Sequence, residues 1–297
     1  MKKLLHALAA AATIAAAPSL AKEPGTPTMM PSGGSIGVPV GANPPPGLYF
    51  IQRSEIFRSN VYSGDTELPI ELDVNSSAQQ LHWVPGFTLL GGSYRGMINI
   101  PLVHATQTAF GDSTSESGVG DVILSPLNIS WMLQPGIFVQ SGISFSLPTG
   151  KFDTAPGAVN LGSNAPAAAI DIGFSYLRDG WNLSAHANYI MYGENDDTNY
   201  KSGNEIMLNW TAMKDLGGFS IGPVGYFRKQ VTDDENNGFA YGGTTSGRAE
   251  QYGIGVGLSK RFGPMELNVN YVHDYHVRNT AGGDKLLINF TTPIGKP

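Results

Sequence analysis

Residues 251–259 alternate apolar side chains with small or polar ones at a strict period of two, and the same period resumes over 265–271 after a turn. One face of the expected strands carries Tyr252, Ile254, Val256, Leu258, Met265, Leu267, Val269 and Tyr271, and the other carries glycines, Ser259, Glu266, Asn268 and Asn270. The same alternation recurs along most of the chain without a convincing helical period, which predicts strands with one apolar face. Segments of about 10 residues, apolar toward lipid and polar toward a lumen, are typical of transmembrane β-barrels.

The alternation and the turn residues delimit about 12 candidate strands. They cover 47–59, 79–90, 92–104, 118–132, 136–148, 167–178, 181–193, 203–215, 219–232, 247–261, 265–277 and 284–292. Short Gly- and Pro-containing turns alternate with longer polar stretches over 60–78, 105–117, 149–166, 194–202, 233–246 and 278–283. Outer-membrane barrels have short periplasmic turns and long external loops. We therefore predict that residues 47–297 form an all-β fold, an antiparallel transmembrane β-barrel.

The period also assigns individual positions to a face of the barrel. Val256 is expected to face lipid, so an arginine there should impair assembly. Its neighbour Gly255 is expected to face the lumen and to tolerate serine. In the strand over 118–132, the apolar phase shifts across Pro126, which cannot donate to a ladder, so a β-bulge is expected at this position.

The N-terminus predicts export. Lys2 and Lys3 precede a short apolar run, and a Ser-Leu-Ala site ends at Ala21, so residues 1–21 have the features of a cleaved signal peptide. The alternative is a membrane anchor, but the run is too short to span a bilayer comfortably. Residues 22–46 are rich in Pro, Gly, Ser and Thr, and we expect a lead-in that is either disordered or folded into the lumen as a plug. The expected location is the outer membrane of a Gram-negative cell.

The composition excludes several functions. A net charge of −6 without a basic patch argues against nucleic-acid binding. The absence of cysteine excludes a disulfide framework and a thiolate metal site. His273 and His276 form an H-x-x-H pattern, but residues three apart on a regular strand point to opposite faces, so no metal site is expected. No cofactor is expected either.

An outer-membrane lipid hydrolase is the enzymatic alternative. Ser184 and His186 share the polar face of one expected strand, but a polar lining produces such pairs by chance, and we expect no enzyme and no catalytic residue. Acidic clusters at 195–197 and 233–235 do not match the spacing of a calcium loop. They fit solvated external loops better.

A set of polar residues on adjacent strands shares the inward phase. The expected lumen-lining residues are Glu205, Asn209, Arg228, Gln230, Glu266, Asn268 and Asn270. Because buried charges normally find partners, Arg228 is expected to pair with Glu205 or Glu266. The pair is either a structural ion pair or a polar constriction that selects solutes.

Six segments carry a resemblance to a known family. They are 44–50 (PPPGLYF), 120–127 (GDVILSPL), 148–153 (PTGKFD), 160–164 (NLGSN), 198–205 (TNYKSGNE) and 225–234 (GYFRKQVTDD). In order and spacing they resemble the transporter-like proteins labelled "putative MetA-pathway of phenol degradation". The resemblance implies an outer-membrane β-barrel that admits hydrophobic or aromatic compounds. The chain departs from many outer-membrane barrels in ending four residues after Pro293 rather than on an aromatic residue.

The function expected from these observations is a channel for passive uptake of small hydrophobic or aromatic compounds. Its partners would be those solutes, outer-membrane lipid and lipopolysaccharide, with no nucleic acid. The alternatives are a structural or adhesion barrel without transport and the lipid hydrolase. The sequence identifies neither the solute nor the oligomeric state.

Overall fold

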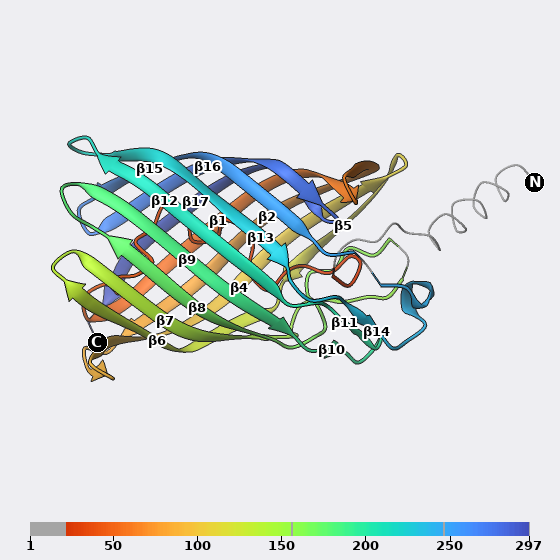
Figure 1. The fold of residues 1–297 in the computed structure, drawn as a ribbon, viewed down its shortest axis with the longest axis horizontal. Coiled ribbons are helices and arrows are strands. Elements are labelled where there is room, and N and C mark those ends of the chain that lie inside the picture. The colour runs from red at the N-terminus through yellow and green to blue at the C-terminus, as the bar shows by residue number, and fades with distance from the viewer. Residues whose placement is uncertain (1–21, 156, 246, 297) are drawn as a thin grey trace, which may run out of the picture.

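Backbone hydrogen bonds join the strands into a closed antiparallel barrel (Figure 1). The computed structural model describes residues 22–155, 157–245 and 247–296, so the expected signal peptide at 1–21 lies outside the described residues. The wall consists of β1 (Gly47–Ser63), β2 (Thr66–Val84), β4 (Gly92–Ala109), β6 (Val122–Gln134), β7 (Ile137–Leu147), β8 (Ala167–Tyr176), β9 (Trp181–Tyr192), β12 (Glu205–Asp215), β13 (Ser220–Gln230), β15 (Glu250–Phe262), β16 (Met265–Arg278) and β17 (Ala281–Gly295). Pairing of β1 with β17 closes the cylinder. The predicted fold class is confirmed.

Smaller elements lie at the ends of the barrel. The strands β3 (Thr88–Leu89) and β5 (Asp112–Val119) pair with β4. A separate sheet of β10 (Glu194–Asn195), β11 (Tyr200–Lys201) and β14 (Glu235–Asn236) lies at the end opposite the C-terminus, beside the 3₁₀ turn η1 (Ala240–Gly243) (Figure 1). Within the described ranges, no helix is both long and apolar enough to cross a membrane.

Connection lengths differ between the two ends. At the end that carries the C-terminus, turns at 135–136, 177–180, 216–219 and 263–264 are short. At the other end, the connections at 148–166, 193–204 and 231–249 are long. The predicted short turns are therefore observed at the end that carries the C-terminus, with a somewhat longer connection at 85–91, and three of the six expected long loops are observed at the opposite end.

The prediction of a long loop is wrong at three of the six expected places. Strands extend through 60–78, 105–117 and 278–283, and two-residue turns at 64–65, 110–111 and 279–280 replace the loops. For the same reason β2 runs over 66–84 rather than 79–90. In the outer part of β2 the pattern is inverted: Val74 lies opposite the buried Phe57, whereas Asp73 lies opposite Arg58 on the outer face. A polar outer face indicates that this hairpin projects beyond the apolar band of the barrel.

The predicted bulge at Pro126 is confirmed. The register of β6 with β7 shifts between Leu124 and Leu127, and the register of β4 with β6 shifts at the same place. The face assigned to Val256 also agrees with the structure, because this side chain is 48 % exposed on the outside of β15. The expected tolerance of Gly255→Ser is contradicted. A Cβ atom at Gly255 would collide with the carbonyl oxygen of Tyr271, so the position has no room for a side chain.

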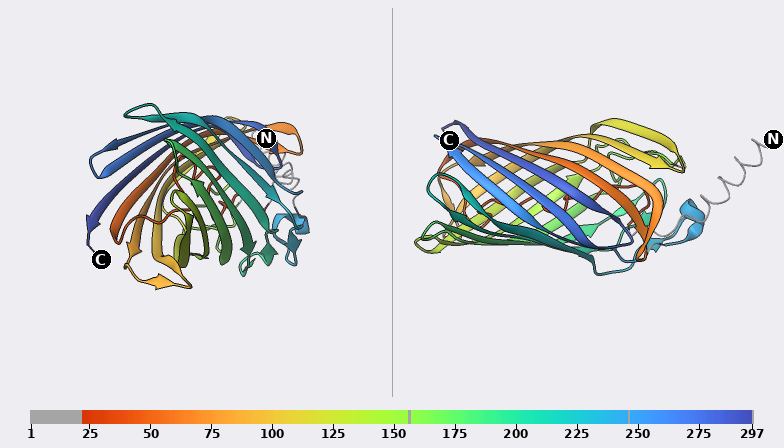
Figure 2. Two further views of the ribbon diagram at one scale, coloured as in Figure 1. Left: turned by 60° about the vertical axis from the view of Figure 1, so that its left-hand side comes forward. Right: turned by 90° about the horizontal axis from the view of Figure 1, so that it is seen from above.

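Residues 22–46 lie inside the barrel (Figure 2). The segment begins beside the long loops, where the Glu23 amide donates to Ser202 Oγ. It continues past Ser32 and Ile36 and reaches the start of β1 at the short-turn end. The polar lining of the barrel therefore surrounds a chain segment rather than an empty lumen.

Candidate functional site: the barrel lumen

The first residues of the segment are held by the external loops. The Glu23 carboxylate accepts hydrogen bonds from Asn195 Nδ2 at 2.9 and 3.0 Å, Thr198 Oγ1 at 2.6 Å and Tyr241 Oη at 3.1 Å. Burial raises the pKa of the Glu23 carboxyl above its ordinary value, and these hydrogen bonds oppose the shift. Lys22 Nζ lies 4.0 Å from the ring centroid of Tyr192. The start of the segment is therefore attached by polar contacts from two loops and β9.

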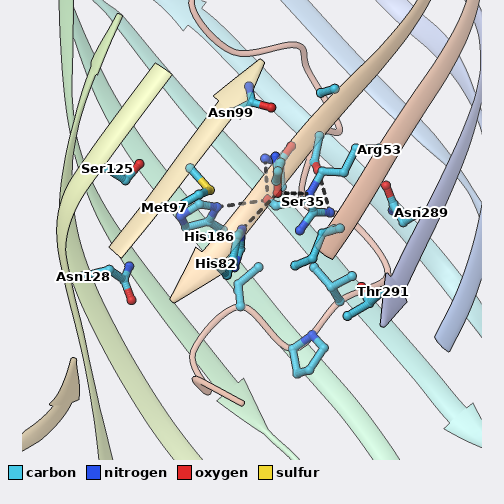
Figure 3. Close-up of a pocket in the computed structure, with 18 of the residues that line it drawn as sticks. Ser35, Arg53, His82, Met97, Asn99, Ser125, Asn128, His186, Asn289 and Thr291 are labelled. Atoms are coloured by element: carbon cyan, nitrogen blue, oxygen red, sulfur yellow. Dashed lines mark hydrogen bonds between the residues drawn. The ribbon is translucent and has the colours of Figure 1, made fainter. Parts of the chain in front are cut away.

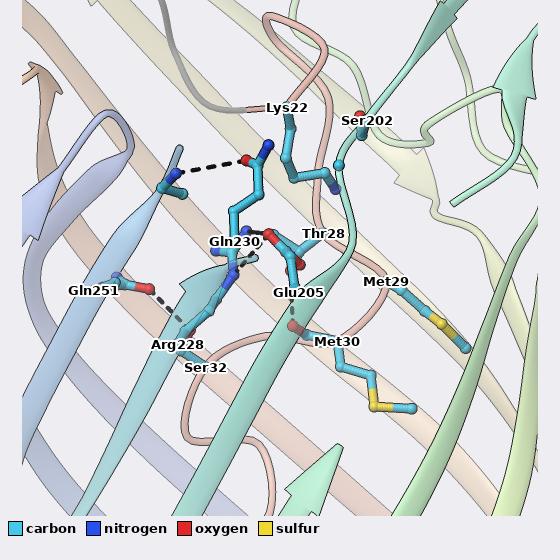
Figure 4. A network of polar contacts seen from close by, with 12 residues as sticks. Lys22, Thr28, Met29, Met30, Ser32, Ser202, Glu205, Arg228, Gln230 and Gln251 are labelled. Atoms are coloured by element: carbon cyan, nitrogen blue, oxygen red, sulfur yellow. Dashed lines mark hydrogen bonds and ion pairs between the residues drawn. The ribbon is translucent and has the colours of Figure 1, made fainter. Parts of the chain in front are cut away.

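The Arg228–Glu205 ion pair lies next to this attachment (Figure 4). Arg228 is 5 % exposed and Glu205 is fully buried. Arg228 Nε donates to Glu205 Oε1 at 3.1 Å, and Tyr192 Oη donates to Glu205 Oε2 at 2.7 Å. The Met29 amide in turn donates to Tyr192 Oη at 3.4 Å. Of the two expected partners of Arg228, Glu205 is the one that forms the pair. Glu266 pairs instead with Arg261 near the short turns.

The other expected lumen residues divide into two groups. Asn209, Glu266 and Asn268 line a cavity in the lumen, whereas Gln230 and Asn270 are buried in polar contacts away from it. Asn209 Oδ1 accepts from the Gly33 amide at 2.9 Å, so this residue also holds the segment. Their contribution to a solute path stays a prediction.

Further polar contacts attach the middle of the segment. Ser32 Oγ donates to Gln251 Oε1 at 2.8 Å, and Lys285 Nζ lies 3.3 Å from the Ser32 carbonyl oxygen and 3.7 Å from Glu55 Oε1. One apolar cluster accompanies them, in which Ile36 packs with Met213, Val224, Tyr226, Val272 and Leu287 from the barrel wall. Around Ile36 the segment is thus packed against β12, β13, β16 and β17.

Two glycines let the segment approach the wall closely. A Cβ atom at Gly37 would collide with the Asn268 side chain, and Gly37 has a φ of +80°, which disfavours any other residue. A Cβ atom at Gly41 would lie 2.6 Å from the amide nitrogen of Ser175. The Gly41 amide donates to Ser175 Oγ at 2.9 Å. The glycine content of residues 22–46 therefore serves close contact with the strands.

The serine–histidine pair considered from the sequence is not formed. Ser184 Oγ is bonded to Ser175 Oγ and Asn182 Oδ1 instead of His186. His186 lies between Ser35 Oγ, 3.0 Å from its Nδ1, and Asp171 Oδ2, 3.2 Å from its Nε2. The row links the segment to β8 and β9. Ser35 lies outside any strand, so no periodic pattern in the sequence points to it.

His273 and His276 both lie on the outer face, contrary to the expected opposite faces. A bulge in β16 between the partners of Tyr252 and Gly253 changes the phase of the strand between the two histidines. His273 bonds to Asp284, whereas His276 bonds to Glu250 and stacks on Tyr252. Among the described residues, no group of three or more His, Cys, Asp or Glu side chains has the arrangement of a metal site.

A cavity of about 480 Å³ lies beside the segment in the lumen (Figure 3). It is lined by the segment and by residues of β1, β2, β4, β6 to β9, β12 and β15 to β17. Its lining mixes apolar groups, such as Ile51, Met97 and Leu127, with amides and charged groups. Arg53, His82, Asn99, Asn128 and His186 are drawn around it in Figure 3. Sequence reasoning missed Arg53 and Arg95, although both follow the inward period of β1 and β4.

A closed antiparallel barrel with an apolar outer surface and a polar interior is the fold of bacterial outer-membrane β-barrels. The family model described as "Putative MetA-pathway of phenol degradation" matches residues 58–290, and the chain belongs to this family. The comparison with curated proteins found no match.

Solved structures agree with this fold. The chain is similar to an outer membrane channel from Pseudomonas putida F1, with 16% identity, a TM-score of 0.74, and coverage of 86% of this chain and 97% of that chain. The β domain of the autotransporter BrkA from Bordetella has 13% identity, a TM-score of 0.45 and coverage of 84% and 100%. The translocator domain of NalP from Neisseria meningitidis has 11% identity, a TM-score of 0.48 and coverage of 86% and 91%. At 16% identity, the similarity to the Pseudomonas putida channel concerns the fold alone.

Proposed function

We propose that the protein is an outer-membrane channel for passive uptake of small hydrophobic or aromatic compounds. The supporting observation is the cavity beside residues 22–46, whose volume of about 480 Å³ suits a small solute. Apolar side chains from β1, β4, β6 and the segment provide contact area, and amides between them provide orientation. Barrels of eight strands are filled by their own side chains and those of 16–18 strands leave open water channels. Twelve strands leave room for a narrow path of mixed polarity.

The family description and the similar barrel from Pseudomonas putida support the same proposal, since that protein is called an outer membrane channel. For this chain, we extend the proposal to location in the outer membrane, export by the segment at 1–21 and contact of the outer face with lipid and lipopolysaccharide. Residues 22–46 act in this proposal as a plug that narrows the lumen.

Uptake by intact cells tests the proposal. Deletion cells are complemented with the wild-type chain, with Met97→Trp or with Ile98→Trp, and the initial uptake of a radiolabelled aromatic hydrocarbon is measured at low concentration. Met97 lines the cavity, whereas its neighbour Ile98 pairs with Leu81 on the outer face. We expect wild type and Ile98→Trp to restore uptake and Met97→Trp to reduce it strongly. Equal uptake by deletion and complemented cells would favour a structural barrel without transport.

A further inference from the structure

The charged groups that line the cavity are unequally paired. Each acid has a basic partner: Glu55 with Lys285 at 3.7 Å, Asp171 with His186 at 3.2 Å, and Glu266 with Arg261 at 3.1 Å. The two remaining arginines, Arg53 and Arg95, form no ion pair with any acid in the described part of the chain. The guanidinium groups of Arg53 and Arg95 therefore line the cavity without an ion pair.

The two arginines differ in their neutral contacts. Arg53 Nη1 donates to the Gly34 carbonyl oxygen at 3.1 Å and its Nε donates to Gln80 Oε1 at 3.2 Å. Gln80 Oε1 also lies 3.1 Å from His82 Nε2. Arg95 Nε is buried and has no hydrogen-bond partner among the described residues. A buried donor without a partner is costly in a folded protein, and a bound acceptor group would remove this cost.

Unpartnered amide atoms surround the same space. Asn99, Asn128 and Asn188 are 7 %, 4 % and 2 % exposed, and all three line the cavity. The Oδ1 atoms of all three, and Nδ2 of Asn188, have no hydrogen-bond partner among the described residues. At another place in the lumen, Ser32 of the segment donates to Gln251. Arg53, Arg95 and the three asparagines thus form a polar patch, in which Arg95 Nε and Asn188 Nδ2 are the donors without a partner among the described residues.

We infer that this patch is a binding site for a small organic carboxylate with an apolar, aromatic-sized body. The guanidinium of Arg95 supplies a planar pair of donors that matches a carboxylate, and Arg53 adds a second positive charge on the neighbouring wall. Ile51, Met97 and Leu127 line the rest of the cavity and contact the body of the solute. The inference rests on the proposed function and narrows its solutes from neutral hydrophobic compounds to amphipathic acids.

Direct binding to the refolded mature protein in detergent tests the inference. Equilibrium dialysis compares benzoate, which is ionised at neutral pH, with benzamide, which has nearly the same shape and no charge; empty micelles correct for partition. We expect benzoate to bind more tightly than benzamide. Added salt should weaken the binding of benzoate and leave the binding of benzamide unchanged. Arg95→Gln should weaken benzoate binding about tenfold or more, because a charge-assisted hydrogen bond is lost.

Arg58→Gln is the matched control. Arg58 lies on β1, as Arg53 does, and its substitution removes the same charge. Its side chain, however, faces outward beside Asp73. Its substitution should leave benzoate affinity unchanged. Heat-modifiable gel mobility checks that each variant is folded, and Arg53→Gln provides a second lumen variant if Arg95→Gln does not fold.

The outcomes separate this inference from the proposed function. Equal affinity for benzoate and benzamide, or an unchanged affinity in both lumen variants, overturns the carboxylate site even when cells take up a neutral aromatic hydrocarbon through the barrel. Selective benzoate binding that depends on Arg95 supports the site even when the uptake assay shows no transport, in which case the proposed function fails and the site stands.

Discussion

The Glu205 carboxylate is fully buried in the lumen, where it pairs with Arg228. The stability of the barrel is therefore expected to depend on Arg228. We expect Arg228→Ala to lower the free energy of unfolding by about 3–5 kcal/mol, because it leaves a buried carboxylate without its cation. Thermal unfolding of the refolded protein, followed by circular dichroism, measures the effect. If the pair also borders the solute path, the ion preference of single channels should change in the same variant.

A double variant shows whether the loss comes from the unpaired charge. Arg228→Ala combined with Glu205→Gln removes both charges, and we expect it to recover much of the stability that Arg228→Ala loses. Arg228→Gln supplies a smaller change of shape for comparison. A double variant as unstable as Arg228→Ala would mean that packing of the long side chain, rather than its charge, stabilises this part of the lumen.

Val256 allows a test of the outer face. It lies in the middle of β15, between the exposed side chains of Ile254 and Leu258. We expect Val256→Arg to cost about 2–4 kcal/mol in a bilayer, since an arginine at mid-membrane faces lipid. Folding into lipid vesicles, measured by gel mobility with and without heating, reports the cost. Val256→Leu serves as the control, because Gly255 has no room for a side chain. Equal folding of both variants would place this strand outside the membrane.

At the scale of elements, the attachment of residues 22–46 should depend on pH. Burial raises the pKa of the Glu23 carboxyl, so the attached segment binds a proton more readily than the free segment. The resulting stabilisation is complete below the ordinary carboxyl pKa and is lost as pH rises through the raised value. We expect a spin label on a cysteine at Pro24, in a chain with no other cysteine, to become more mobile as pH rises from about 4 to about 7.

Glu23→Gln is the control for this pH dependence. Glutamine keeps the hydrogen bonds of the Glu23 site in part and does not titrate, so the mobility of the label should vary less with pH. Asp234, whose pKa is also raised by burial, accepts from the Gly203 amide and from Tyr200 nearby. Any slope that persists in Glu23→Gln is assigned to this group. An unchanged slope would show that Glu23 does not govern the attachment.

The sequence predicts the elements that meet lipid and misses those that do not. The strands β15 and β16 alternate clearly because one face contacts an apolar phase and the other does not. The outer part of β2 pairs with β1 and β4, and β5 pairs with β4, by the same backbone hydrogen bonds as the other strands. However, β5 is polar on both faces, and the apolar side chains of β2 change from the outer to the inner face. Pattern reasoning interpreted both as loops, although the hydrogen-bond ladder extends through them.

The site was less accessible to sequence reasoning than the fold. The inward phase of β12, β13 and β16 predicts polar residues such as Asn209 and Asn268, which the structure places in the lumen. The position of residues 22–46 could not be predicted in detail, because no period relates Ser32 or Ser35 to partners that lie more than 150 residues away. The importance of Arg53 and Arg95 could not be predicted, because only the structure shows that neither forms an ion pair with a described residue.

At the scale of the whole molecule, the barrel wall and the segment inside it are separable. The wall is closed by its own hydrogen bonds, including the pairs of β1 with β17. The segment adds side-chain contacts to this wall and no strand. We therefore expect a chain without residues 22–46 to fold as a barrel, with reduced thermal stability because Ile36 and its cluster lose their packing.

The same deletion should open the lumen. Without the segment, a barrel of twelve strands lies between the filled eight-stranded barrels and the open porins, so we expect its single-channel conductance in planar bilayers to rise several-fold over wild type. The Arg53 and Arg95 side chains, which form no ion pair in the described part of the chain, would then face a wider aqueous path, and we expect anions to carry more of the current than cations. A reversal potential in a salt gradient measures this preference. A deletion variant that folds and conducts no better than wild type would mean that residues of the wall, rather than residues 22–46, limit passage.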